Sequence, residues 1–142
     1  MFLADLNWFA IVAATLAAFV AGAIWFGPKT FYPVWWKLMG KEPTENPGSA
    51  TSMVIVFSFT AIAAFVEAIA VATVIFFVAA DQPDFGILQG GFTGLLLGVG
   101  LAAASSLSHR LFAGHGFRVW IIEAGSDIVN LTIMGLIIGS WR

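Results

Sequence analysis

The chain has 142 residues, of which 60% are hydrophobic and only 10% are charged, and its mean hydropathy is +0.95. A soluble domain carries roughly 25% charged residues, so this composition excludes a water-soluble fold. The formal net charge of -2 provides no basic surface for nucleic acid, and the lack of cysteine excludes disulfides, thiolate nucleophiles and cysteine metal sites.

Four apolar segments are long enough to cross a bilayer, since about 20 helical residues span its hydrocarbon core. These segments cover residues 7–26, 53–79, 85–107 and 117–138. We expect all four to be helices, because a chain in lipid must satisfy its backbone hydrogen bonds internally. The sequence therefore predicts an all-α integral membrane protein with four transmembrane helices in a single domain, residues 1–142.

The segment after the first span, residues 28–40, combines aromatic, apolar and basic side chains. Its apolar residues recur at helical spacing, which predicts a short helix in the membrane interface that begins at Pro28. Trp35, Trp36 and Lys37 are candidate lipid-interface residues. The simplest interpretation is an aromatic belt that fixes the depth of the protein in the membrane, and a lateral gate or lipid-binding ledge is the alternative.

The second span, residues 53–79, contains the ionisable residue Glu67. A carboxylate in hydrocarbon is costly, so such residues normally face a bundle interior, pair with another group, or mark a path for ions or substrate. Small residues, including Thr60, Ala63 and Ala70, share the helical face of Glu67. We therefore expect Glu67 to lie at a packed helix interface.

The third span, residues 85–107, carries small residues at a spacing of four, namely Gly90, Gly94, Gly98 and Ala102. One face of this helix has almost no side chains, so a neighbouring helix can approach it closely. Packing within the bundle is the simplest interpretation. Four short helices cannot bury all of their small-residue faces on one another, however, and we therefore also expect a homo-oligomer that forms through small-residue faces such as this one.

The connection between the last two spans, SLSHRLFAGHGFR, is basic, aromatic and partly helical in its sequence pattern. Its simplest interpretation is a turn at the membrane surface, from which Arg110 and Arg118 extend toward water. Binding of an anionic lipid headgroup is the alternative. His109 and His115 stand six residues apart, which fits no common zinc motif, and we expect neither a metal nor another cofactor.

The fourth span, residues 117–138, carries Glu123, Asp127 and Asn130 at spacings of four and three, so these polar residues share one face of an apolar helix. Counting about 1.5 Å per residue places Glu67 and Asn130 at a similar depth near the midplane, with Asp127 about one turn shallower. We expect Glu67, Asp127 and Asn130 to form a cluster there. Glu123 should lie nearer the surface.

Such a cluster of acids has three interpretations. Two carboxylates in a low-dielectric setting resist joint ionisation, which suits a proton relay or a site for a monovalent cation. Protonated carboxyls that clamp the helices through hydrogen bonds explain the same pattern, and so does a docking site for another membrane subunit. No lysine or arginine lies at a matching depth, so we expect no salt bridge between these acids and the rest of the chain.

Five of the six basic residues lie on one side of the predicted bundle, and only Arg142 lies on the other. The five are Lys29, Lys37 and Lys41 between the first two spans, and Arg110 and Arg118 between the last two. Basic loops normally stay in the cytoplasm. We therefore expect both loops to be cytoplasmic and both termini to lie outside.

Three stretches in this order resemble the bacterial membrane family catalogued as domain of unknown function 1761. They are NWFAIVAATLAAFVAGAIWFGPKTFYPVWWKLMG, the turn SHRLFAGHGFR and the closing AGSDIVNLTIMGLIIGSWR. The resemblance covers the whole chain and implies a small four-helix protein of the bacterial cytoplasmic membrane, with no established activity. In that family an amide, a tyrosine and a histidine more often occupy the places of Glu123, Ser126 and Asp127, which implies that the acidic stripe is peculiar to a subgroup.

No GxSxG, HExxH or P-loop motif occurs in the chain, and we expect no enzymatic activity. The polar residues near the midplane favour a small transporter or an ion- or proton-handling protein that uses its intramembrane carboxylates. The alternative is an accessory or assembly subunit of a larger membrane complex, in which the acids serve as a helix clamp or docking site.

Overall fold

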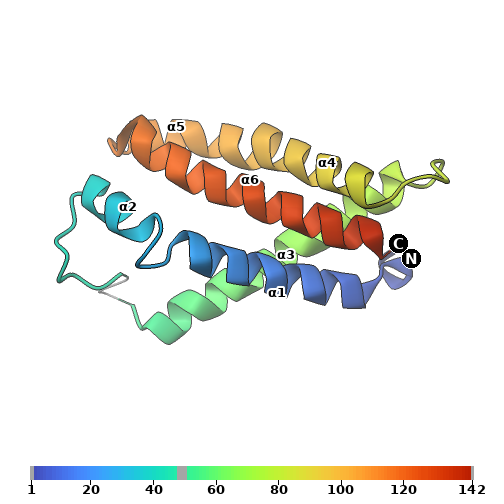
Figure 1. Ribbon diagram of the computed structural model, residues 1–142, viewed down its shortest axis with the longest axis horizontal. Helices are drawn as coiled ribbons and strands as arrows, with labels where there is room; N and C mark the ends of the chain where they lie inside the picture. Colours follow the sequence, from blue (N-terminus) through green and yellow to red (C-terminus); the bar gives the residue numbers. More distant parts are fainter. Residues whose placement is uncertain (1, 48–50, 142) are drawn as a thin grey trace.

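Figure 1 shows a computed structural model of the chain, which describes residues 2–47 and 51–141. Its elements are η1 (Phe2–Asp5), α1 (Trp8–Trp25), α2 (Tyr32–Leu38), α3 (Met53–Val78), α4 (Ile87–Leu97), the π-helical η2 (Gly98–Ala103), α5 (Ala104–Phe112) and α6 (Gly116–Ser140). Four helices are long and apolar enough to cross a membrane. The predicted fold class, four such helices with a short helix between the first two, is confirmed.

The third spanning helix is longer than the sequence predicted. α4, η2 and α5 form one continuous helix, Ile87–Phe112, where the apolar segment ended at residue 107. The polar residues after Leu107 remain helical because α5 packs against α6. Arg110 therefore lies on a helix, not in a turn.

The short helix α2 begins at Tyr32, later than expected. Pro28, the expected first residue, lies in a turn instead. The Thr30 hydroxyl lies within hydrogen-bonding distance of the carbonyl oxygens of Ile24 and Trp25, which closes the end of α1. Pro33 instead occupies the first turn of α2, where a missing N–H costs nothing. This turn folds α2 back over one end of the bundle (Figure 1).

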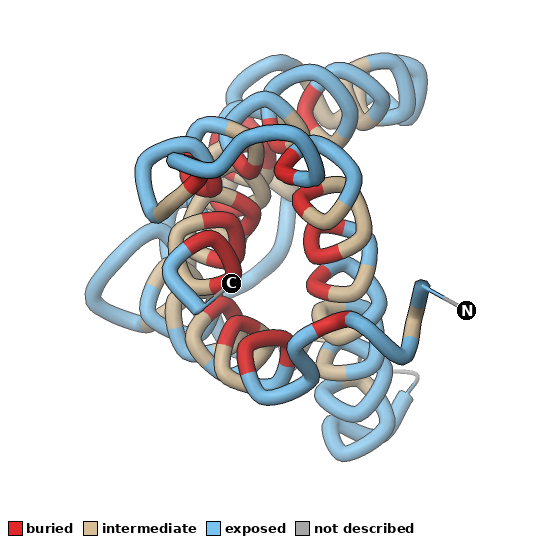
Figure 2. The backbone as a smooth tube through the Cα atoms, turned by 90° about the vertical axis from the view of Figure 1, so that its right-hand side faces the viewer, coloured by how far each residue is buried: buried red, intermediate tan, exposed pale blue. Residues whose placement is uncertain are grey.

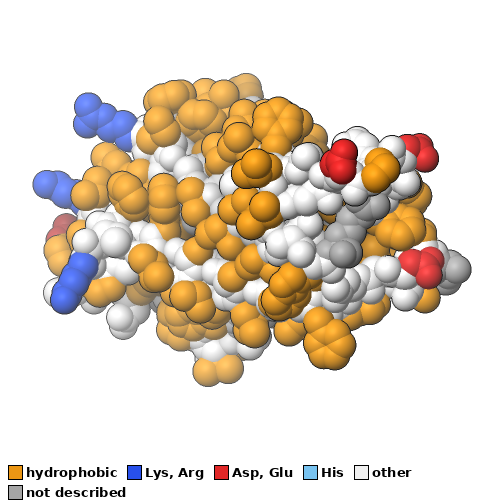
Figure 3. Space-filling model, turned by 45° about the vertical axis from the view of Figure 1, so that its right-hand side comes forward, with side chains coloured by type: hydrophobic (Ala, Val, Ile, Leu, Met, Phe, Trp, Pro, Cys, Tyr) orange, Lys and Arg blue, Asp and Glu red, His pale blue; other side chains and the backbone are white. Residues whose placement is uncertain are grey.

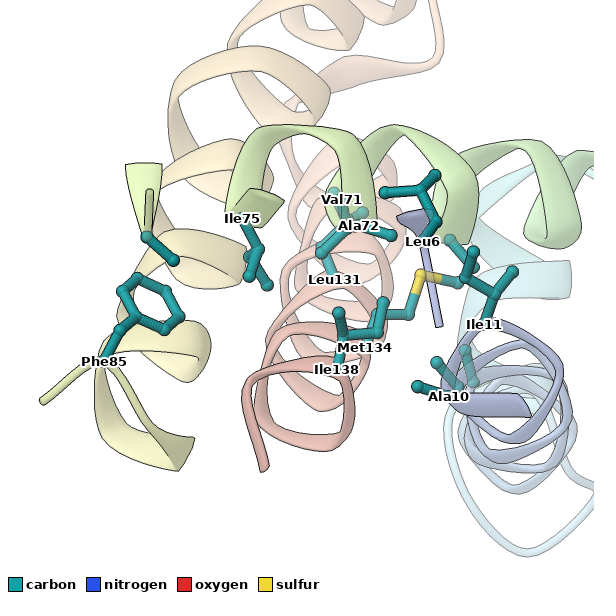
Figure 4. Packing of buried hydrophobic residues seen from close by; sticks show 14 residues of the cluster. Leu6, Ala10, Ile11, Val71, Ala72, Ile75, Phe85, Leu131, Met134 and Ile138 are labelled. Carbon is teal, nitrogen blue, oxygen red and sulfur yellow. The ribbon is translucent and has the colours of Figure 1, made fainter. Parts of the chain in front are cut away.

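α6 is the central helix of the bundle and contacts α1, α3 and α4 (Figure 1). Figure 2 shows that the buried residues face one another across the helices and that the outer surfaces are exposed. Figure 4 shows Met134 extending from α6 toward Ile11 of α1, with Val71 and Ile75 of α3 nearby. Met134, Ile11 and Val71 are all almost completely buried, so this contact fixes α1 and α3 on the central helix.

The glycine row of the third span packs against α6 of the same chain. A Cβ built on Gly90 or Gly94 would overlap a backbone carbonyl oxygen of α6, and one on Gly98 would lie 2.8 Å from Ile128 Cα. Only glycine permits such a close approach of two backbones. The three glycines of this face are therefore covered within the chain, and the association of several copies stays a prediction.

Large apolar side chains cover the outside of the bundle, as Figure 3 shows. Phe9, Leu88 and Phe112 are among the most exposed of them. In this view the lysine and arginine side chains gather at the end that carries α2, and most acidic side chains lie at the opposite end. An apolar belt between two charged ends is typical of a membrane protein. Arg142, which we expected on the side opposite to the other basic residues, lies outside the described residues.

Candidate functional site

A polar cluster at the basic end of the bundle centres on Glu123 of α6. The Nε atom of Arg110 in α5 lies 2.5 Å from Glu123 Oε2. The Nε1 atom of Trp35 in α2 donates a hydrogen bond of 2.9 Å to Glu123 Oε1. The side chains of Glu123 and Arg110 are only 14% and 35% exposed, so this half-buried carboxylate joins three helices.

The prediction that no salt bridge forms between these acids and the chain is therefore wrong for Glu123. Arg110 points inward to this carboxylate, although we expected it to extend freely toward water. The pair forms because a tight turn with positive φ at Gly114 and Gly116, which glycine adopts easily, folds α5 back along α6. The glycines of the AGHG sequence were the signal for this turn, since antiparallel helices joined by a short loop lie side by side.

Two residues that the sequence did not single out complete this cluster. His115 Nδ1 lies 3.3 Å from a terminal guanidinium nitrogen of Arg110. The Nε1 atom of Trp25 donates to the Ile122 carbonyl at 3.0 Å, and a Cβ on Gly125 would lie 2.8 Å from the Trp25 ring. Trp25 therefore covers α6 directly beside Glu123, and the small size of Gly125 makes room for it.

Asp127 and Glu67 form a second acidic group, deeper in the bundle. Asp127 lies one turn after Glu123 on α6 and is half-buried, whereas Glu67 of α3 is exposed on the surface of the chain. Asp127 interacts electrostatically with Glu67, Glu123 and Arg110. Within residues 2–47 and 51–141, no hydrogen bond or ion pair reaches the carboxylate of Asp127 or Glu67.

The exposure of Glu67 differs from the packed position that its small neighbours indicated. α3 crosses the bundle obliquely (Figure 1), so its first half lies apart from α6 while its second half packs. The buried residues of α3, from Ala68 to Ile75, all follow Glu67. Glu67 therefore lies where α3 leaves the bundle, and its small neighbours Thr60, Ala63 and Ala70 are exposed as well.

Asn130, the third polar residue of the stripe, is half-buried and lies next to α1. A Cβ built on Gly22 of α1 would lie 3.6 Å from Asn130 Nδ2. In the described part of the chain, no hydrogen bond joins Asn130 to Glu67 or Asp127. The structure thus brings Glu67 and Asp127 within electrostatic reach and places Asn130 against another helix.

Three of the candidate lipid-interface residues bind groups of the protein itself, since Arg110 also pairs with Glu123. Trp35 binds Glu123, and Trp36 is only 8% exposed and donates to the Glu42 carbonyl at 2.9 Å. Lys37 and Arg118 are exposed at the basic end. Their contact with lipid headgroups stays a prediction. Among the described residues, no group of three histidine or acidic side chains could hold a metal ion.

A family model described as Protein of unknown function (DUF1761) matches residues 9–139. The match runs from the first turn of α1 almost to the end of α6 and thus includes every residue of the two acidic groups. No curated protein and no solved structure matches the chain.

Proposed function

The chain belongs to the family described as Protein of unknown function (DUF1761), and because that description names no activity, we propose a function from the chemistry of its buried acids. We propose that this protein binds and transfers protons or a small monovalent cation in the bacterial cytoplasmic membrane. Asp127 and Glu67 are the residues that bind the ion.

The contrast between the two carboxylates of α6 carries this proposal. Glu123 is neutralised by Arg110 and receives a second hydrogen bond from Trp35. Asp127, one turn away, has no such partner among the described residues. Arg110 attracts Asp127 only from a distance, while Glu123 and Glu67 repel it. Glu123 is therefore a structural residue, and Asp127 is the one that remains available for chemistry.

An unpaired carboxylate in a low-dielectric setting needs a positive partner. A proton or a monovalent cation supplies one charge, which suits two carboxylates that resist joint ionisation. Glu67 lies at the point where α3 separates from the bundle and is exposed, so the packing within this chain does not enclose its carboxylate. Asp127 is half-buried beside it, which gives the ion a second, more enclosed position.

Flux measurements on the purified protein in liposomes test this proposal. Asp127→Asn and Glu67→Gln should each reduce proton or cation flux, because both changes remove the charge and keep the shape. Asp5→Asn and Glu45→Gln are matched controls: both residues are exposed outside the spanning helices, and their variants should conduct like the wild type. If neither Asp127→Asn nor Glu67→Gln changes the flux, or if the wild type conducts no better than empty liposomes, the proposal is wrong.

The alternative is an accessory subunit of a larger membrane complex, and the exposure of Glu67 favours it. A charged residue in the middle of an exposed apolar helix face requires a partner, and the small side chains of Ala63 and Ala70 would let another helix approach. This function requires a defined larger partner that co-purifies in mild detergents and is lost in Glu67→Gln. Recovery of the chain alone in several such detergents would contradict it.

A further inference from the structure

A groove of about 590 Å³ runs between α3 and α4, at the end of the bundle that carries the two termini. Its walls are mainly apolar and include Val74 and Val78 on α3 and Leu88, Phe92 and Leu96 on α4. None of these residues belongs to either acidic group. The groove opens onto the apolar belt, since Leu88, Phe92 and Leu96 are all exposed.

We propose that this groove binds one acyl chain of a membrane phospholipid whose headgroup carries an ammonium group. The proposal is independent of proton or cation handling at Asp127. It rests on the lining of the groove, its length, and the charges at its mouth.

The few polar side chains in the groove are satisfied by their own helices or turns. Gln82 Nε2 donates to the Val78 carbonyl at 3.0 Å, and Gln89 Oε1 accepts from the Gly86 N–H at 3.1 Å. The Thr93 hydroxyl donates to the Gln89 carbonyl at 2.8 Å. These groups leave the groove with an apolar lining, and the ligand that fits an apolar lining within a bilayer is a hydrocarbon chain.

The length of the groove matches one leaflet of a bilayer. On α4 its lining extends from Leu88 to Leu97, which is about 13 Å of helix. Half of the hydrocarbon core is about 15 Å thick, so a single acyl chain would run along the groove from its mouth to the midplane.

A transmembrane helix of a second copy is a poor fit for the same space. A helix is about 10–12 Å across, so a 13 Å length of it occupies on the order of 1,000 Å³. The groove provides about 590 Å³. A helix would therefore protrude from the groove over much of its cross-section, whereas a single acyl chain is thin enough to lie within it.

The loop at the mouth of the groove carries two acidic residues. The loop that joins α3 to α4 contributes Gln82 and Phe85 to the lining, and the same loop carries the exposed residues Asp81 and Asp84. In Figure 3, acidic side chains lie at this end of the molecule. Carboxylates attract an ammonium group and repel an anionic headgroup, so phosphatidylethanolamine should bind better than phosphatidylglycerol.

Native mass spectrometry of the purified protein, incubated with equal amounts of phosphatidylethanolamine and phosphatidylglycerol, tests this proposal. The wild type should retain one phosphatidylethanolamine. Leu96→Trp fills the groove and should lose this lipid. Leu101→Trp is the matched control, because Leu101 is an exposed leucine of the same continuous helix outside the groove. The double variant Asp81→Asn, Asp84→Asn should retain lipid but lose the preference for the ammonium headgroup.

Cross-linking of the wild type provides a second test that no folding defect can affect. A phospholipid with a photoactivatable acyl chain should label Val78, Leu88, Phe92 and Leu96 in preference to the equally exposed Val99 and Leu101. Labelling of all exposed apolar residues to the same extent would overturn the proposal. So would equal lipid retention by the two tryptophan variants, or a second copy of the chain in place of lipid.

Discussion

Two donors from other helices reach the carboxylate of Glu123 on the apolar helix α6. Arg110 supplies a guanidinium from α5, and Trp35 supplies an indole N–H from α2. Removing one partner of a largely buried ion pair is destabilising, because it leaves the charge of the other partner uncompensated. The pair therefore links the α5–α6 hairpin to the short helix α2.

A double-mutant cycle with Arg110→Met and Glu123→Gln tests this link. Glutamine keeps an acceptor for Trp35, and methionine keeps much of the apolar stem of Arg110, so the cycle isolates the charge pair. We expect a coupling free energy of about 1–2 kcal/mol, below the value for a fully buried pair because Arg110 is 35% exposed. The measurement is the free energy of unfolding of the four proteins in detergent micelles, and simple additivity of the two losses would contradict the link.

Among the helices, α4 and α6 make the closest backbone approach, through glycines on both sides. Gly90 faces Gly135 and Gly139, and Gly94 faces the backbone at Leu131. Lipid provides no hydrophobic force between helices, so close van der Waals packing of this kind has to supply the stability. This contact holds the helix that lines the lipid groove against the helix that carries Glu123 and Asp127.

Gly94→Ala should therefore lower the free energy of unfolding by about 1–3 kcal/mol, because the added Cβ pushes the two backbones apart. Gly100→Ala is the matched control on the same continuous helix, where a Cβ meets no atom within 4 Å. There the substitution should leave stability unchanged or raise it by up to about 1 kcal/mol, since alanine favours a helix. Equal effects of the two substitutions on unfolding in micelles would show that this contact is not tight.

The sequence predicted which helices exist better than it predicted where they end and what they contact. Long apolar runs and the membrane thickness are local properties, so the four spans and the short helix could be predicted. The start of α2 depended on the contact of Thr30 with the end of α1, and the end of the third helix depended on packing against α6. Because that helix was expected to stop at residue 107, Arg110 was assigned to a turn, and its pairing with Glu123 was missed.

The polar residues along one face of α6, Glu123, Asp127 and Asn130, also show which features the sequence can predict and which it cannot. Its spacing on one face of α6 could be predicted from helical geometry, and so could the closeness of Asp127 to Glu67. The exposure of Glu67 could not be predicted from the sequence, because it depends on the angle at which α3 crosses the bundle. Side chains along one helix face are set by local sequence, whereas the partner on another helix is set by the crossing angle.

Over the whole molecule, charge is separated along the long axis of the bundle. Lysines and arginines gather at the end with α2 and the α5–α6 turn, and acidic residues of the loop between α3 and α4 lie at the other end (Figure 3). Both termini lie at the acidic end (Figure 1). Basic residues near helix ends keep their loops in the cytoplasm, so the shape and the charge together favour termini on the outer side.

Cysteine labelling in whole cells tests this orientation, and the chain is well suited to it because it has no native cysteine. Glu45→Cys in the linker between α2 and α3, at the basic end, and Asp84→Cys in the acidic loop are both at exposed positions and leave every lysine and arginine in place. A membrane-impermeant maleimide should label Asp84→Cys in intact cells and should label Glu45→Cys only after the membrane is permeabilised. The reverse pattern would place the Arg110–Glu123 pair on the outer side, and the mouth of the lipid groove would then face the cytoplasmic leaflet. The labelling result therefore also determines which leaflet supplies the bound acyl chain.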